Sequence, residues 1–218
     1  MRIVLMGPPG VGKGTQAVRL ARRLGLVHVA TGDILRDAMR GGTALGDKVR
    51  EFVEDGRLVP DDLMGALIGE RLKNPDAADG FVLDGFPRTE EQVATLDRVL
   101  GFVGVRVDRI IVLRAPDAEI VRRLAGRRVC PNCKAVFHVD NKPPRTAGTC
   151  DDCGEVLMRR KDDAEEVVLG RLAVFARQTE PAIRIYRERG LVEDVDSVGE
   201  PGEVAERLWN ALASERLG

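Results

Sequence analysis

The sequence lacks an excess of charge of either sign, because 34 lysines and arginines face 35 aspartates and glutamates, for a net charge of −1. This balance argues against a broad basic face for nucleic acid or for an anionic membrane. The longest apolar stretches are only as long as a strand, so none could span a bilayer. The N-terminal MRIVLMGPPG is too short for a signal peptide and runs straight into a motif. We therefore expect a cytoplasmic protein in a reducing compartment.

The remaining composition is that of an ordinary globular protein, with 44% hydrophobic and 32% charged residues. A chain of 218 residues can form one large domain, or a core with smaller inserted segments, around a substantial apolar interior.

Short apolar runs alternate with stretches of helical periodicity along most of the chain. The predicted strands are 2–6, 81–84, 109–113 and 191–195. The predicted helices are 14–24, 61–73, 89–100, 117–125, 163–189 and 203–216. Strands separated by helices predict an α/β fold with a parallel sheet covered on both faces. Residues 31–59 and 126–162 do not fit the alternation, and we interpret them as excursions from the core.

The stretch GPPGVGKGT, residues 7–15, follows the first strand and opens the first helix. This placement predicts a phosphate-binding loop, because glycines let backbone N–H groups turn toward an anion and the helix N-terminus adds its positive dipole end. Lys13 supplies a mobile charge for the outer phosphates. Gly14 follows this lysine, so the hydroxyl of Thr15 comes one residue later than in the general pattern. The alternative is a glycine-rich turn that binds nothing.

A second motif, FVLDGFPRTEEQ at residues 81–92, offers an acceptor site for a phosphoryl group. Asp84 closes a strand, where a carboxylate can hold magnesium directly or through water. Gly85 permits close approach of another molecule, and Arg88 presents a planar fork that suits a phosphoryl group. The alternatives are a strand-end cap for Asp84 and a surface charge for Arg88.

All the cysteines of the chain form two pairs, C-x2-C and C-x2-C, separated by sixteen residues: Cys130, Cys133, Cys150 and Cys153. Three interpretations compete: a structural zinc site with four thiolate ligands, two disulfides, or a redox CxxC. A reducing compartment disfavours disulfides, and a redox motif should open a helix after a strand. The pattern therefore favours structural zinc, and four thiolates leave no open position for chemistry.

Six segments in order resemble the adenylate kinases of the long form, which have a full-length lid. They are GPPGVGKGT, ATGDILR (30–36), DGRLVPDDL (55–63), FVLDGFPRTEEQ, AGRRV (125–129) and RRKDDAEEVVLGRL (159–172). The resemblance covers essentially the whole chain, and the GKGT ending is the family's own.

The resemblance implies the P-loop nucleoside-monophosphate kinase fold, a five-stranded parallel sheet flanked by helices. It implies a core of residues 1–29, 60–125 and 164–218, an NMP-binding flap at 30–59 and a lid at 126–163. The implied activity is direct, reversible transfer of the γ-phosphoryl of MgATP to AMP, giving two ADP and maintaining the balance of adenine nucleotides. The implied cofactors are Mg²⁺ with ATP and a structural Zn²⁺. The expected partners are ATP, AMP and ADP, with no nucleic acid and no membrane, and the expected state is a monomer.

The same resemblance assigns site residues. Those implied in catalysis are Lys13, Asp84, Arg88, Arg123, Arg160 and Arg171. Those implied on the ATP side are Gly10, Val11, Gly12, Lys13, Gly14, Thr15, Arg127, Val136, Phe137 and Gly199. Those implied on the AMP side are Thr31, Arg36, Arg57, Leu58, Val59, Gly85, Phe86, Pro87, Arg88, Gln92, Arg160 and Arg171. Near Gly199, VDSVGEP replaces the DG that is common in the family.

Gln92 matters most for specificity, because its amide donates and accepts together and fits the edge of adenine. Without the motif, we would interpret it as an exposed helix residue.

The lid is too small to bury much apolar surface, and HVDNKPPRTAG offers little core. A metal site would hold its shape, so that the lid swings as a rigid body, brings Arg127 and Arg160 to the phosphates and excludes water. Asp162 and Asp163 lie at the hinge, where they either help lock the closed form or simply start a solvated helix.

Two rival functions remain. A kinase for GMP, UMP or CMP is disfavoured by Gln92 and Thr31. A P-loop switch or ATPase with a zinc ribbon would need a water-orienting residue and aromatics among basic residues. Phe137 is the only aromatic residue between the cysteine pairs.

Overall fold

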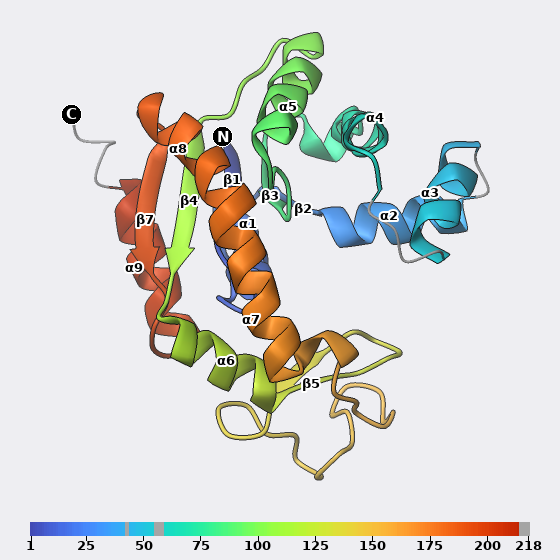
Figure 1. The fold of residues 1–218 in the computed structure, drawn as a ribbon, viewed down its shortest axis with the longest axis vertical. Coiled ribbons are helices and arrows are strands. Elements are labelled where there is room, and N and C mark those ends of the chain that lie inside the picture. Colours follow the sequence, from blue (N-terminus) through green and yellow to red (C-terminus); the bar gives the residue numbers. More distant parts are fainter. Residues whose placement is uncertain (42–43, 55–58, 214–218) are drawn as a thin grey trace.

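The computed structural model describes residues 1–41, 44–54 and 59–213. Its centre is a sheet of five parallel strands in the order β2-β3-β1-β4-β7 (Figure 1). The strands are β1 Arg2–Met6, β2 Val27–Ala30, β3 Phe81–Asp84, β4 Arg109–Arg114 and β7 Val192–Asp196. The predicted α/β fold with a parallel sheet is confirmed.

Helices cover both faces of this sheet. The helices of the core are α1 Lys13–Leu24, α4 Asp61–Leu72, α5 Glu90–Phe102, α6 Asp117–Gly126, α7 Glu165–Val174, α8 Glu180–Glu188 and α9 Pro201–Ala213, with a 3₁₀ turn η1 at Pro75–Ala77. Side chains of a strand point alternately to its two faces, so β1 contributes to two separate cores. Ile3 and Leu5 pack with α1 and α9, whereas Val4 and Met6 pack with the side of α4, α5 and α8.

β1 is the central strand of the sheet, and the chain adds strands on both sides of it. β1 pairs with β3 on one side and with β4 on the other. In an open parallel sheet, ligands bind beyond the carboxyl ends of the strands where the direction of winding reverses. This point is where residues 7–15 leave β1 and enter α1.

Two segments extend from this sheet and its covering helices, and we call them the two excursions. α2 Thr31–Arg40 and α3 Ala44–Glu54 extend to one side beyond β2 (Figure 1). The second excursion follows α6 and contains the antiparallel pair β5 Arg127–Val129 and β6 Val136–His138. It ends with a 3₁₀ turn, η2 Lys161–Asp163, that leads into α7.

The predicted strands lack β2 of the central sheet and the short pair β5 and β6 of the second excursion. β2, with the sequence VHVA, pairs in parallel with β3 from Val27 to Ala30. It is a four-residue edge strand and only Val29 is fully buried, so its apolar signal is weak. The helix before it ends at Gly25, which adopts a left-handed φ of 66° and donates its N–H to the last turn.

The predicted helix over 163–189 is present from Glu165 to Glu188, but it is not uniform. It follows η2 and consists of α7, a π-helical stretch η3 at Phe175–Thr179, and α8. Pro181 lies at the start of α8. Proline lacks an N–H and its ring collides with the carbonyl four residues earlier, so a wider turn before it lets the helix continue.

Within the described parts of the chain, no helix is both long enough and apolar enough to cross a bilayer.

Candidate active site

The phosphate-binding loop occupies the carboxyl end of β1. Gly10 and Gly12 have φ values of 79° and 104°, a region that favours glycine. A Cβ on Gly10 would also lie 2.6 Å from the side chain of Leu124, so α6 leaves no room for a larger residue there. Gly12 immediately precedes the first turn of α1, where the unpaired N–H groups lie. The loop therefore has the backbone of an anion site.

The side chain of Lys13 folds back onto this loop. Its Nζ donates to the carbonyls of Gly7 and Pro8, both at 2.8 Å. Burial lowers the pKa of Lys13 to about 8, the nearby Asp84 carboxylate opposes this shift, and Arg88 and Arg171 add to it. The lysine is thus held ready for an anion by two neutral acceptors.

Four charged residues from separate segments meet beside the loop. Lys13 opens α1, Asp84 ends β3, Arg88 follows β3 and Arg171 lies in α7. Burial raises the pKa of Asp84, partly offset by Lys13 and other cations, and burial lowers the pKa of Arg88. Three cations and one carboxylate in a partly dehydrated space favour an additional anion, because water screens the like charges there only in part.

The Asp84 carboxylate faces the start of α1, since a Cβ on Gly14 would lie 3.4 Å from its Oδ2. A hard oxygen ligand beside a phosphate loop fits Mg²⁺, which prefers one or two carboxylates plus phosphates and waters. The residues present therefore suit a magnesium ion that arrives with a nucleotide.

The loop after β3 forms the second half of the site. Gly85 has a φ of 94°, and a side chain there would collide with the hydroxyl of Thr31. The Thr31 hydroxyl donates to the Asp84 carbonyl at 3.4 Å, which ties the start of α2 to this loop. Arg88 donates from Nε to the Gly85 carbonyl at 2.8 Å. Phe86 is buried in the core, so the loop has a fixed anchor.

Gln92 lies in the first turn of α5, and its amide is held on both sides. Its Oε1 accepts from the backbone N–H of Arg88 at 2.8 Å, and its Nε2 donates to Asp61 at 2.6 Å. Thr89 caps the same helix by accepting from the Gln92 backbone N–H. The sequence analysis did not anticipate Asp61.

Arg123 lies behind the phosphate loop and joins three groups. It donates to Glu119 at 2.7 Å, to the Ser197 carbonyl at 2.7 Å and to the Val11 carbonyl at 3.3 Å. The buried Ser197 hydroxyl donates to the same Val11 carbonyl at 3.0 Å. Ser197 and Gln16, which donates to the Pro201 carbonyl, were also missed, because their partners are far away in the sequence.

The loop that contains Gly199 therefore lies against the phosphate loop. Gly199 has a φ of 110°, and a Cβ there would lie 2.5 Å from Glu203. Arg207 donates to the carbonyl of Asp196 at 2.6 Å and also to that of Val198.

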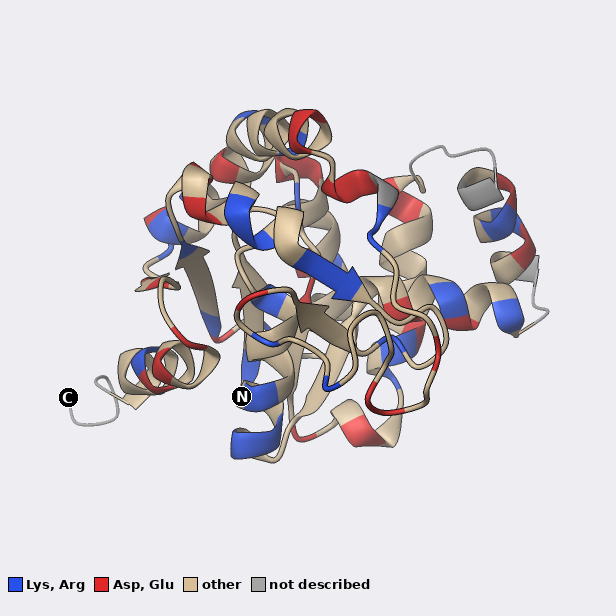
Figure 2. Ribbon diagram, turned by 90° about the horizontal axis from the view of Figure 1, so that it is seen from below, with Lys and Arg blue, Asp and Glu red and all other residues tan. Residues whose placement is uncertain are grey.

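Arg127 of the second excursion and Arg171 of α7 are each paired with a carboxylate of η2. Arg127 forms two hydrogen bonds with the buried Asp163, at 2.8 and 2.5 Å. Arg171 donates to the side chain of Asp162 at 2.9 Å. Burial and the neighbouring Arg127 lower the pKa of Arg160, and Asp162 and Asp163 oppose this. Seen from below, Figure 2 shows basic and acidic segments interspersed around this end of the molecule.

The remaining predicted residues lie at the periphery of this arrangement. Arg36 pairs with Asp33 at 2.5 Å on the exposed face of α2. Phe137 is buried in the second excursion, and the carbonyl of Val136 accepts from Lys142. Arg57 and Leu58 lie outside the described residues, and Val59 is half-buried just before α4.

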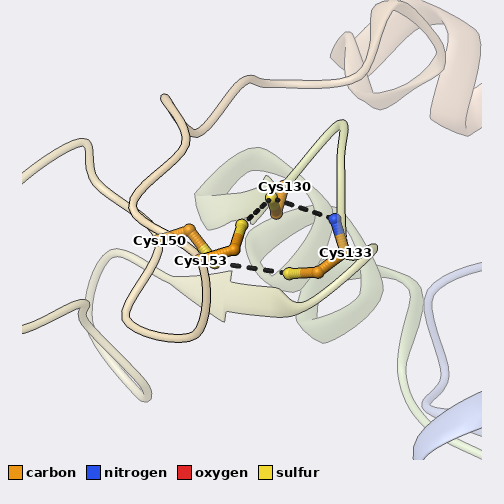
Figure 3. A group of neighbouring side chains, drawn as sticks. All are labelled: Cys130, Cys133, Cys150 and Cys153. Atoms are coloured by element: carbon orange, nitrogen blue, oxygen red, sulfur yellow. Dashed lines mark hydrogen bonds between the residues drawn. The ribbon is translucent and has the colours of Figure 1, made fainter.

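The four cysteines converge on one point (Figure 3). Their sulfurs all lie within 4.8 Å of one another, with 3.4 Å between Cys130 and Cys153 and 3.5 Å between Cys133 and Cys150. A disulfide needs about 2.05 Å, and all four thiols are free. Tetrahedral zinc with Zn–S bonds of about 2.3 Å sets its sulfurs about 3.8 Å apart, so the arrangement fits zinc.

Little else stabilises this excursion. Its apolar cluster consists of Cys130, Phe137, Cys150 and Leu157, with Ala135 packed against it. So small a core cannot alone offset the chain entropy of nearly forty residues. A metal bound by the thiolates would supply the missing stability.

Comparisons with known proteins agree with this site. A family model of adenylate kinases matches residues 5–191. The chain is 47% identical to an adenylate kinase of Streptomyces avermitilis over 99% of this chain and 98% of the relative. It is 47% identical to one of Symbiobacterium thermophilum over 99% of this chain and 100% of the relative. It is 42% identical to one of Methanothrix thermoacetophila over 98% of this chain and 99% of the relative. Because the family model and the relatives match almost the whole chain, the chain belongs to the adenylate kinase family.

Proposed function

We propose that the charged groups at the carboxyl end of the sheet perform the family's reaction, the reversible transfer of the γ-phosphoryl of MgATP to AMP. As a member of the family, the chain is an ATP:AMP phosphotransferase. The observation that best supports the proposed assignment of residues is the convergence of Lys13, Asp84, Arg88 and Arg171 beside a glycine-lined loop.

On the donor side, we assign the triphosphate to the loop Gly10–Thr15 and to Lys13. Lys13 donates to two backbone carbonyls, and it would exchange them for the outer phosphates. Arg123 and Ser197 fix the Val11 carbonyl and so keep the loop from collapsing. We also retain Arg127, the backbone at Val136 and Phe137, and Gly199 as ATP contacts.

On the acceptor side, we assign the phosphate of AMP to Arg36, Arg88, Arg160 and Arg171 and its base to Thr31 and Gln92. The backbone at 57–59 and at 85–87 would complete this pocket. Arginine suits the task because its guanidinium is always charged and can bind two oxygens at once.

These residues hold the acceptor oxygen, the phosphorus and the leaving oxygen in line, and they balance the charge on the transferring group. No protein nucleophile is needed, since positioning and electrostatic stabilisation are the main contributions in direct phosphoryl transfer. Asp84 would hold the magnesium, directly or through water, and the bound ion neutralises charge on the β- and γ-phosphates.

We propose that residues 1–29, 60–125 and 164–218 form a stable core, that 30–59 is an NMP-binding flap and that 126–163 is a lid. The pairs Arg171–Asp162 and Arg127–Asp163 lie where the lid meets α7, which supports a hinge there. Closure would bring Arg127 and Arg160 over the phosphates and exclude water.

We assign a structural zinc ion to Cys130, Cys133, Cys150 and Cys153. Free thiols are compatible with a reducing, cytoplasmic location. We further propose a monomer that binds ATP, AMP and ADP and no nucleic acid. Gel filtration at micromolar concentration tests the monomer.

A substrate panel tests the function. The purified protein is incubated with ATP, Mg²⁺ and one nucleoside monophosphate at a time, and ADP is followed. AMP should be converted far faster than GMP, UMP or CMP. Equal rates with all four acceptors, or ATP hydrolysis without an acceptor, would refute the proposal.

A further inference from the structure

The amide of Gln92 is clamped between two groups of opposite hydrogen-bonding character. On one side the backbone N–H of Arg88 donates to Oε1 at 2.8 Å, and on the other Nε2 donates to the Asp61 carboxylate at 2.6 Å. The three residues come from α5, from the loop after β3 and from the first turn of α4.

This clamp permits only one orientation of the amide. An ionised carboxylate can only accept hydrogen bonds, and a backbone N–H can only donate. Turning the amide over would set the Gln92 oxygen against the Asp61 oxygens and its NH₂ group against the Arg88 N–H. Both contacts would then be repulsive, and two hydrogen bonds would be lost.

We propose that Asp61 is a positioning residue that fixes the orientation of the Gln92 amide, and that this orientation makes the enzyme select 6-aminopurine over 6-oxopurine monophosphates. The inference rests on the proposed binding of AMP beside Gln92.

The selection of adenine follows from the hydrogen-bonding groups of the Gln92 amide that Asp61 and Arg88 do not engage. A primary amide has two N–H groups and two lone pairs, and Asp61 and Arg88 engage one of each. One donor and one acceptor remain, which match adenine, where the 6-amino group donates and a ring nitrogen accepts. A 6-oxopurine presents an acceptor at position 6 instead. A freely turning glutamine could serve either base, whereas a fixed one rejects the second.

The frame around Asp61 is rigid enough for this role. One turn further along α4, a Cβ on Gly65 would lie 2.5 Å from Thr95 of α5, so the two helices touch closely there. Gln92 lies one turn before Thr95 on its own helix. The carboxylate also lies in the first turn of α4, where negative charge is favourable.

The chain offers a matched control. Asp62 is the next residue of the same helix turn and is exposed. Asp61→Asn and Asp62→Asn therefore remove the same charge from the same helix end, and only the first changes the partner of Gln92. Asn at 61 can either accept from or donate to the amide, so it no longer dictates the orientation.

The experiment compares kcat/KM for AMP with kcat/KM for IMP, which differs from AMP in the groups at position 6 and the adjacent ring nitrogen. In Asp61→Asn the ratio should fall by roughly 10- to 100-fold, as expected when a hydrogen bond to a charged acceptor no longer discriminates. Asp62→Asn should keep the ratio within about 2-fold. Asp61→Ser, which keeps a residue favoured at helix starts, should behave like Asp61→Asn and guards against misfolding of the first variant.

A double variant shows whether Asp61 acts through Gln92. In a Gln92→Ala background, adding Asp61→Asn should leave the ratio unchanged, since no amide remains to orient. A purely structural role for Asp61 would lower both rates together and keep their ratio. An unchanged ratio in folded Asp61→Asn and Asp61→Ser overturns the inference, whereas a wild type that converts no AMP refutes the proposed function itself.

Discussion

The two turns that present the cysteines have the same backbone but different residues at the critical position. In each, the first cysteine accepts at its carbonyl from the residue after the second cysteine: Lys134 donates to Cys130 at 3.2 Å, and Gly154 donates to Cys150 at 2.9 Å. The donors have φ values of 66° and 75°. We predict that Lys134→Gly stabilises the lid and that Gly154→Ala destabilises it.

The magnitude follows from two opposing contributions. A left-handed φ costs an L-residue about 1–2 kcal/mol, and the greater freedom of glycine in the unfolded chain returns roughly 0.5–1 kcal/mol of this. A Cβ on Gly154 would meet no atom within 4 Å, so only these backbone contributions change there. Lys134→Gly also loses an exposed hydrogen bond to the Pro131 carbonyl. We expect a gain of about 0.5 kcal/mol for Lys134→Gly and a loss of about 1 kcal/mol for Gly154→Ala.

Hydrogen exchange of the lid amides in the zinc-saturated protein measures this difference. The two variants should differ by about 1.5 kcal/mol in the free energy of local opening, which is roughly a tenfold difference in exchange rate. Gly190, between α8 and β7, has a φ of 69° and open space around it, so Gly190→Ala adds the same strain outside the lid. Slower exchange in Gly154→Ala, or faster exchange in Lys134→Gly, would refute the reasoning.

Four further predictions concern other parts of the molecule. Lys13 is charged below its lowered pKa of about 8 and loses its charge as the pH rises through that value, so kcat/KM for MgATP should fall above pH 8 in the wild type but not in Lys13→Arg. Asp162→Asn should tighten AMP binding by about 2- to 5-fold in calorimetry, because Arg171 loses a competing partner that is half-exposed and therefore weak. Chelation of zinc, or Cys130→Ser, should melt the lid before the core when both are followed by hydrogen exchange. Tyr186→Phe should raise the melting temperature by a few degrees, since the buried Tyr186 hydroxyl has no hydrogen-bond partner among the described residues and its removal is worth about 1 kcal/mol.

The phosphate loop could be predicted from sequence because its structure is determined locally. The apolar run of β1, the glycines after it and the helical periodicity of α1 all lie within 24 residues. Glycine is required for local reasons; at Gly10, for example, Leu124 leaves no space for a side chain. The cysteine pairs are equally local, because each turn sets its own two sulfurs.

β2 and the π-helical stretch after α7 could not be predicted in the same way. The stability of β2 comes from pairing with β3, whose residues lie more than fifty positions later. A four-residue edge strand has too few apolar positions to reveal this pairing. The π-helical stretch depends on the wider turn before Pro181 and leaves the apolar period almost unchanged.

The partners of the site residues were the least predictable feature, and they share a physical logic. Arg127 and Arg171 are each held by an aspartate, and Lys13 is held by two carbonyls. An unpaired cation in a partly dehydrated site would be costly, and each of these three cations has an internal partner. At these proposed nucleotide contacts, binding would exchange hydrogen bonds rather than add new ones. Such an exchange lowers the net affinity for nucleotide, while the side chains are already held in an ordered arrangement. Product release would be faster when each cationic side chain can return to an internal hydrogen-bond acceptor. This favours an enzyme whose products resemble its substrates.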